Sequence, residues 1–413
     1  MMEVLAPAGN MEKLKAAFYF GADAVYFAGK NFGLRAFAGN FSDDEIIEAS
    51  NFAHGMGKRA YVTLNIVARN SDFDGLEEYL RLLEKANVDG VIISDIGVIQ
   101  FVHDVAPSLN IHVSTQANVL NKYSAKFFCN MGVTRIVLAR ELSLKEIKEI
   151  RDSIPKNVEI ECFVHGAMCI SYSGRCLLSN YLSGRDSNRG ACVQACRWEY
   201  TITEKSRKND HYEIQEDDRG TYILNSKDMC MIKYLKEMED AGICSLKIEG
   251  RMKSAYYVAS VTNAYRRAVD LLEKVRREKR DYTSDELAQL DELYKECEKT
   301  SHRNFTTAFY LGNNEKKEYL ESSMPVQTHE FMAVVLEKTK AGYALIEQRN
   351  NFKVGDELEV LSPSDEFNKI FVVEELLDEN GESIDVANKV QQTLKLKTSL
   401  KLNPGDILRK RIV

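Results

Sequence analysis

The chain of 413 residues has only six prolines and one tryptophan, and none of its apolar runs is long enough to cross a bilayer. Hydrophobic residues make up 44% of it, which together with the scarce proline excludes collagen-like and low-complexity disordered chains. Residues 1–10 lack the basic segment followed by an apolar stretch that marks a secretory signal. We therefore expect a cytoplasmic globular protein of two or three domains with no membrane partner.

An excess of positive charge is also missing. Lys and Arg number 55 against 62 Asp and Glu, which gives a formal net charge of −7. This balance excludes a protein whose whole surface attracts nucleic acid, but it leaves room for a local basic patch.

What the sequence does contain is a repeated pattern in its first two thirds. Short apolar runs alternate with amphipathic stretches, which is typical of strand–helix units. The eight expected strands are residues 3–6, 24–28, 59–64, 90–94, 111–115, 135–139, 158–164 and 245–249. The helical patterns between them include residues 11–20, 43–54, 76–86, 123–131 and 143–153. Eight such units predict an α/β protein with a TIM-like (β/α)8 barrel, and a doubly wound open sheet is the alternative.

The predicted domain organisation follows from where this pattern breaks. The catalytic barrel spans residues 1–277 and contains a Cys-rich insertion, residues 165–227, after the seventh strand. Residues 228–241 then predict a helix, and residues 255–274 predict the helix that completes the eighth unit. A helical connector, residues 278–324 with a helix at 284–300, leads to a small C-terminal β-barrel domain, residues 325–413. Its strands are expected at residues 331–337, 342–348, 357–361, 370–377, 393–398 and 407–410.

Five of the nine cysteines lie within 35 residues, and Cys162 among them falls inside a predicted strand as a core residue. Cys169, Cys176, Cys192 and Cys196 remain, spaced C-x6-C-x15-C-x3-C in a loop-rich segment. Four thiolates suit an iron–sulfur cluster or zinc. Structural zinc usually takes two tight pairs, and only the last two cysteines form one, so the spacing favours the cluster.

Two further features bear on this predicted metal site. Cys230 is a rival fourth ligand, although its place at the start of a predicted helix is explained more plainly by burial against the barrel. The segment from residue 175 to residue 197 contains four arginines and a single acidic residue, Asp186; the arginines are Arg175, Arg185, Arg189 and Arg197. Their charge could offset a thiolate-bound cluster or hold phosphate, and ordinary loop ion pairs are the third reading.

Polar residues follow the ends of the predicted strands. In a (β/α)8 barrel these ends form the face where active sites are built. We expect this face to carry Asn10, Asn65, Gln116, Asn118, Arg140, Glu141, His165, Lys247, Glu249 and Arg251. His165, Glu249 and Arg251 are the candidate catalytic residues, and the others, with Arg175, Arg189 and Arg197, are candidates for substrate binding. Any one of them taken alone is better explained as a helix cap or a structural ion pair, whereas together on one face they indicate a site.

Three motifs carry a family resemblance. They are Leu5-Ala6-Pro7-Ala8-Gly9-Asn10, the segment from Glu161 to Ser179 with its Gly-Arg-Cys-Leu-Leu-Ser, and Lys247-Ile248-Glu249-Gly250-Arg251. They resemble the collagenase-like U32 peptidase family, and the resemblance covers nearly the whole chain. Within that family, residues 190–200 and the overall length are most similar to the tRNA hydroxylation proteins, which help to convert the wobble uridine of certain tRNAs to 5-hydroxyuridine.

The resemblance implies several things that the spacing alone does not. It implies a 4Fe-4S cluster on Cys169, Cys176, Cys192 and Cys196, tRNA as the partner, and prephenate as a participant in the reaction. The polar strand ends would then hold this small-molecule carboxylate. A partner subunit or a homo-oligomer remains open.

Two other functions stay in view. The first is the hydrolysis of peptide bonds that the family name suggests, but the sequence has no His-Glu-x-x-His and no Gly-x-Ser-x-Gly motif. A pair of Cys169 with His165 is the conceivable nucleophile and base, although a thiolate bound to a cluster is not a free nucleophile. The second is a zinc-stabilised RNA-binding protein without catalytic activity.

Overall fold

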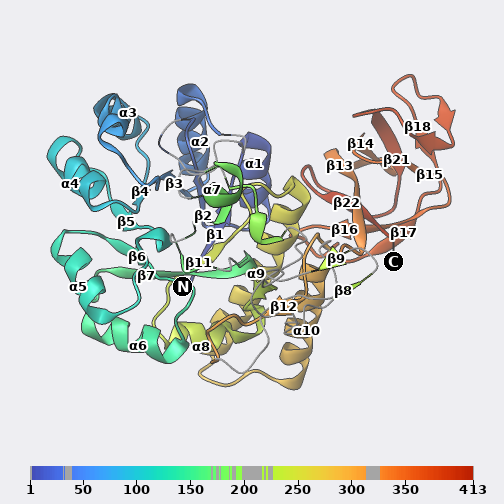
Figure 1. Ribbon diagram of the computed structural model, residues 1–413. Helices are drawn as coiled ribbons and strands as arrows, with labels where there is room; N and C mark the ends of the chain where they lie inside the picture. The colour runs from blue at the N-terminus through green and yellow to red at the C-terminus, as the bar shows by residue number, and fades with distance from the viewer. Residues whose placement is uncertain are drawn as a thin grey trace.

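The computed structural model describes residues 2–30, 32, 40–168, 171–173, 176, 178–185, 187, 192–197, 216–217, 220–221, 227–312 and 326–412. Cys169, Arg175 and Arg189 lie outside the described residues, and Arg197 is described only as part of a short helix. Figure 1 shows a barrel surrounded by helices and a second, sheet-rich unit beside it. No helix in the described ranges combines the length and the apolar character needed to span a membrane.

Eight parallel strands form the barrel. They are β1 (Glu3–Pro7), β2 (Ala24–Phe27), β3 (Arg59–Leu64), β4 (Gly90–Ile93), β5 (Ile111–Val113), β6 (Arg135–Val137), β7 (Glu159–Ala167) and β11 (Ser245–Ile248). Each strand from β1 to β7 pairs with the next, and β11 pairs with both β7 and β1. The sheet therefore closes, which confirms the predicted (β/α)8 barrel and excludes the open sheet.

Helices cover the outside of this barrel (Figure 1). They are α1 (Met11–Tyr19), α2 (Asp43–Gly55), α3 (Leu76–Lys85), α4 (Ile96–Val105), α5 (Lys122–Asn130), α6 (Leu144–Ser153), α8 (Leu235–Asp240) and α9 (Ala255–Arg277). Short 3-10 helices are η1 (Asn70–Phe73), η2 (Thr115–Ala117), η4 (Ala195–Arg197) and η5 (Ile232–Tyr234). Ser42 and Ser143 cap α2 and α6 through capping boxes, which fixes where those helices begin.

The segment 228–241 differs from the prediction of one helix. It begins with a strand, β10 (Asp228–Cys230), and continues through η5 into α8. β10 pairs antiparallel with the far end of β7, where Cys230 lies opposite His165. Nine residues make β7 the longest barrel strand, so its last residues extend past the strands beside it. Their backbone groups need partners, and β10 supplies them.

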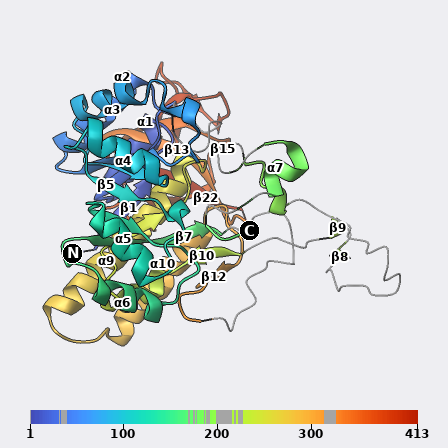
Figure 2. The same ribbon diagram turned by 60° about the vertical axis from the view of Figure 1, so that its left-hand side comes forward.

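A helix and a pair of short strands belong to the insertion. Helix α7 (Leu178–Ser183) projects to one side of the barrel, as Figure 2 shows. The two-residue strands β8 (Glu216–Asp217) and β9 (Gly220–Thr221) pair with each other. The connector supplies α10 (Ser284–Glu298) and β12 (Phe305–Thr306), and β12 pairs with β10.

The C-terminal unit is an antiparallel half-barrel with its own apolar core. Its strands are β13 (His329–Lys340), β14 (Tyr343–Gln348), β15 (Phe352–Lys353), β16 (Glu357–Leu361), β17 (Ile370–Val372), β18 (Leu376–Leu377), β19 (Ser383–Ile384), β20 (Val386–Ala387), β21 (Thr393–Lys397) and β22 (Ile407–Arg411). The single strand predicted at residues 370–377 is in fact two strands, because β17 pairs with β16 and β18 pairs with β21.

Buried contacts fix this half-barrel against the helices of the barrel. Phe20, Tyr256 and Ile407 share one apolar cluster between the two units. Beside it, the guanidinium of Arg409 donates to the carboxylate of Glu296 in α10 at 2.8 Å, and both side chains are fully buried. The two units therefore pack as one body, held by apolar burial and by a charge pair out of contact with water.

Candidate functional site

The inside of the barrel holds a network of buried charges. Glu161 of β7 accepts a hydrogen bond from Lys247 of β11 at 2.6 Å and from Arg135 of β6 at 3.0 Å. Arg135 also donates to Glu3 at 2.6 Å. Burial alone would raise the pKa of Glu161, but the two cations outweigh it and hold the pKa below its ordinary range. Glu161 is therefore a buried carboxylate anion that fixes Lys247 below the C-terminal face.

Three buried cations lie at or just below the ends of the strands. The ammonium of Lys247 sits 4.4 Å from the ring centre of Tyr26 and 5.5 Å from that of Phe163. The guanidinium of Arg140 lies 5.4 Å from the same Phe163 ring and donates to a backbone carbonyl at the end of β7. Arg251 is 5% exposed and donates to the hydroxyl of Thr63 at 3.3 Å. This arrangement suits a ligand with carboxylate groups.

The loop that carries Arg251 is held by a close backbone approach. A Cβ atom added to Gly9 would lie 2.5 Å from the carbonyl oxygen of Arg251, and Lys13 donates to that same oxygen at 3.3 Å. The glycine of the first motif is thus needed because the loop of the third motif packs directly on it.

The predicted amide side chains divide into two kinds. Gln116 and Asn118 each have a buried side-chain oxygen without a hydrogen-bond partner among the described residues. Such acceptors require a donor, and a bound molecule can provide it. Asn10 instead caps α1 by accepting from the backbone N–H of Lys13 at 3.0 Å. The backbone carbonyl of Asn65 accepts from Ser94 at 3.2 Å.

Glu141 joins the barrel to the cysteine-bearing segment. Its carboxylate accepts from the backbone N–H of Ser173 at 3.0 Å and from the Ser173 hydroxyl at 3.2 Å. The loop between the first two cysteines of the motif is therefore tied to the end of β6. The predicted substrate-binding residue acts here as an anchor for that loop.

Two of the described cysteines of the motif, Cys176 and Cys192, accept hydrogen bonds at sulfur. Burial raises the pKa of Cys176, but hydrogen bonds from Ser171, Ser187 and the start of α7 outweigh it and lower the pKa. The backbone N–H of Gln194 donates to the Sγ of Cys192 at 3.3 Å. Hydrogen bonds of this kind favour the thiolate, which is the form that binds metal.

Ser179 in α7 links the two cysteine loops. Its hydroxyl accepts from the backbone N–H of Val193 at 3.1 Å and donates to the carbonyl of Arg185 at 2.6 Å. Cys192 is exposed, and Cys176 and Cys196 are half-buried. The Gly-Arg-Cys-Leu-Leu-Ser motif thus carries both a thiol and the hydroxyl that positions the next cysteine loop.

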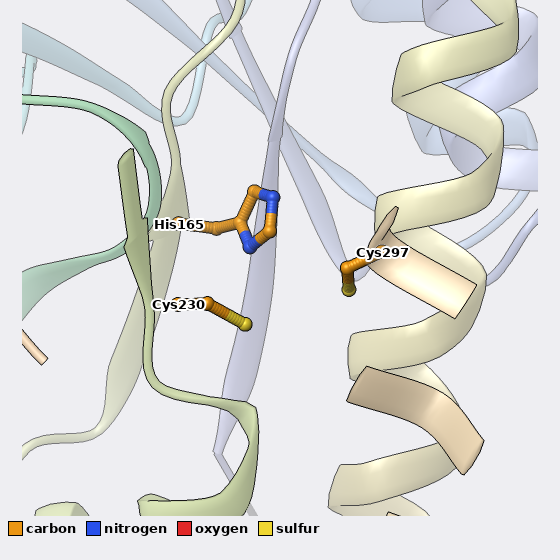
Figure 3. Close-up of side chains that lie close together, drawn as sticks. All are labelled: His165, Cys230 and Cys297. Carbon is orange, nitrogen blue, oxygen red and sulfur yellow. The ribbon is translucent and has the colours of Figure 1, made fainter. Parts of the chain in front are cut away.

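A second group of ligand-type side chains is buried at the far end of β7. His165 of β7, Cys230 of β10 and Cys297 at the end of α10 converge, as Figure 3 shows. Their ligand atoms all lie within 4.8 Å of one another, and in the described part of the chain no other group of three does so. The hydroxyl of Tyr265 contacts the Nδ1 of His165 at 3.5 Å.

This buried group shows new surroundings for two predicted residues, Cys230 and His165. Burial would raise the pKa of Cys230, but Cys297 and His165 outweigh it and hold the pKa well below its ordinary range. Among the described cysteines, Cys230 lies beside His165, on a strand and not at the start of a helix. Cys169, the predicted partner of His165, lies outside the described residues. Cys297 joins this group without any sequence signal, because it is a lone cysteine in an amphipathic helix. Cys162 is buried, as predicted for a core residue.

The remaining predicted residue, Glu249, is half-buried after β11. Its backbone N–H donates to the carbonyl of His165 at 2.9 Å, and its own carbonyl accepts from Tyr257. The backbone of Glu249 therefore positions the end of β11 beside the end of β7.

Fold and site together define a class of protein. It is a (β/α)8 barrel with buried cations at its strand ends and a cysteine-bearing insertion anchored at its mouth. Residues 9–319 match the sequence pattern of Peptidase family U32, and residues 327–409 match that of the Peptidase family U32 C-terminal domain. The chain therefore belongs to the U32 family.

This chain is similar to proteins named for tRNA hydroxylation and to a protein named as a collagenase. The tRNA hydroxylation protein P1 of Bacillus subtilis is 40% identical over 412 residues, which cover 99% of this chain and 94% of that protein. The tRNA hydroxylation protein P of Escherichia coli is 34% identical, with 93% of this chain and 91% of that protein covered. A collagenase of Porphyromonas gingivalis is 31% identical, with 75% and 73% covered.

Proposed function

We propose that this protein is a tRNA-modifying enzyme that hydroxylates wobble uridine to 5-hydroxyuridine, with a 4Fe-4S cluster and with prephenate as a participant. One observation carries the proposal. The cysteine loops, with hydrogen-bonded thiols, are anchored at a barrel mouth lined by buried cations. The chain that builds this site is similar over 99% of its length to a protein named for tRNA hydroxylation.

The chemistry of the cysteine loops fits a cluster. Cys169, Cys176, Cys192 and Cys196 would hold it, with Cys230 as the rival to Cys196. The N–H and O–H groups directed at the sulfurs of Cys176 and Cys192 are the outer contacts that thiolate ligands of iron–sulfur clusters use. When bound, the cluster would transfer electrons or bind the oxygen donor.

The cations at the mouth fit the small-molecule participant. Prephenate carries two carboxylates and a hydroxyl group. Arg251 and Arg140 would bind the carboxylates, since guanidinium groups pair with them through two parallel hydrogen bonds. The hydroxyl would donate to one of the two unpartnered oxygens, that of Gln116 or that of Asn118. Lys247, fixed by Glu161, adds positive charge beneath the ligand.

The test is the nucleoside content of tRNA from cells that lack the gene and express one variant each. The wild type is expected to restore 5-hydroxyuridine, whereas Cys176→Ser and Arg251→Gln are not. Lys401→Gln, an exposed change in the half-barrel, is the matched control and should restore it fully. Normal 5-hydroxyuridine with Cys176→Ser would contradict the cluster, and none with the wild type would contradict the proposed reaction.

The second candidate is peptide hydrolysis, which the pairing of Cys230 with His165 and the similarity to a collagenase favour. Their side chains are 3% and 1% exposed, so a peptide could reach them only after a rearrangement. Cleavage of gelatin or casein by the metal-free protein, abolished in Cys230→Ser, would establish this activity. We expect no cleavage.

A further inference from the structure

The outer face of α5 combines exposed aromatic rings with exposed lysines. Tyr123 is 72% exposed and Phe127 is 49% exposed. The ammonium groups of Lys122 and Lys126 lie 5.6 Å and 5.8 Å from the ring centre of Tyr123. An aromatic ring this open is unusual on a helix whose other face, with Ala125 and Phe128, is buried in the normal way.

The charge around this face is one-sided, although the protein as a whole is acidic. Residues 105–140 contain four Lys and Arg but no Asp or Glu. Two of these cations, Arg135 and Arg140, are buried in the barrel, so Lys122 and Lys126 supply the surface charge. The neighbouring α6 carries acids and bases together: Glu146, Glu149 and Asp152 are exposed beside Lys145 and Lys148, and Asp152 is paired with Lys148. The face therefore attracts anions.

The first turn of α5 lies at the same end of the barrel as the candidate site, the C-terminal end of the strands. Each helix of a (β/α)8 barrel starts at the C-terminal end of the preceding strand. Tyr123 lies in the first turn of α5, and the same connection after β5 carries Gln116 and Asn118 of the candidate site. A large substrate bound over the mouth would extend across this rim.

We infer that the face formed by Lys122, Tyr123, Lys126 and Phe127 is a docking surface for the substrate tRNA, with an unpaired base stacked on Tyr123 and phosphates on the two lysines. This inference rests on the proposed function and adds the RNA contact that it lacks. Stacking on an aromatic ring and pairing of lysine with phosphate are the two contacts by which proteins hold single-stranded nucleic acid. A protein partner would match the apolar rings but would not explain why α5 itself carries lysines and no acidic residue.

The test is the binding of unmodified tRNA to the full-length protein over a series of salt concentrations. Tyr123→Ala should weaken binding about tenfold, whereas Tyr123→Phe keeps the ring and should bind normally. Lys122→Gln with Lys126→Gln should make the plot of log affinity against log salt shallower by about 1.4–1.8. Lys156→Gln with Arg277→Gln removes two exposed cations at the opposite end of the barrel and should change neither quantity.

The outcomes separate this inference from the proposed function. If the wild type binds and hydroxylates tRNA but Tyr123→Ala and the double lysine variant bind equally well, the docking surface is wrong and the proposed function stands. If the wild type neither binds nor modifies tRNA, both are wrong. A change in oligomeric state caused by Tyr123→Ala without RNA would show that the face binds protein, which also overturns the inference.

Discussion

Replacing Glu161 by Gln should destabilise the barrel strongly, because it leaves one buried cation without its counter-charge. Lys247 loses its carboxylate partner, whereas Arg135 keeps Glu3. Removing one partner of a buried ion pair costs about 3–5 kcal/mol. With a urea dependence of about 3 kcal/mol per molar for a domain of this size, the unfolding midpoint should fall by about 1–1.7 M.

The assay is urea unfolding followed by circular dichroism, with Lys247→Met and the double variant beside Glu161→Gln. Because the double variant removes both charges, it should regain much of the stability that Glu161→Gln loses. A midpoint for Glu161→Gln that is unchanged, or a double variant whose loss equals the sum of the two single losses, would refute the role of this pair.

The dependence on pH follows from the direction of the pKa shift. Because the pKa of Glu161 is lower in the folded protein than its ordinary value of 4.5, the ionised carboxylate adds stability at pH values above 4.5. That contribution is lost as the pH falls through the folded pKa. The stability difference between wild type and Glu161→Gln should therefore be largest at neutral pH and shrink under acidic conditions, and a difference that grows on acidification would contradict this reasoning.

Three further predictions concern other parts of the molecule. Ser179→Ala should lower the iron content of anaerobically purified protein without changing its melting temperature by more than a few degrees, because the hydroxyl links two loops; unchanged iron would contradict this. Gly9→Ala should abolish tRNA modification by displacing the Arg251 loop, at a cost of about 1–3 kcal/mol in stability, and full activity would refute the close approach. Arg409→Met leaves buried Glu296 with Lys299 as its remaining cation partner and removes the charge pair between the two units, so it should split thermal unfolding into two calorimetric transitions, whereas a single unshifted transition would argue against that contact.

Much of the fold is predictable from the chain because its signals are local. The eight barrel strands are short apolar runs, and the capping boxes at Ser42 and Ser143 mark two helix starts. The strand at Asp228–Cys230 was not predictable in this way, because it forms to satisfy the far end of β7, which lies about 60 residues earlier in the chain. The local pattern of apolar residues could likewise not separate β17 from β18, whose partner strands lie toward opposite edges of the sheet.

The candidate site likewise combines residues that a local sequence signal predicts with residues that only distant contacts bring together. Strand ends brought Arg140, Lys247 and Arg251 to one face, as their positions in the sequence predict. The pairing of Lys247 with Glu161 depends on two inward-facing positions of neighbouring strands, and the alternation of polar and apolar residues in β7 was the available signal for it. Cys297 had no signal at all, since only tertiary packing brings its helix to His165.

The most direct test of the central claim is the iron, sulfide and zinc content of protein purified without oxygen, together with its visible absorption spectrum. The wild type should contain about four iron and four sulfide per chain. Cys169→Ser, Cys176→Ser, Cys192→Ser and Cys196→Ser should lose them, and Cys230→Ser should keep them. If Cys230→Ser loses the cluster and Cys196→Ser keeps it, the fourth ligand is Cys230. Protein that is free of metal, or that holds one zinc per chain, would contradict the account.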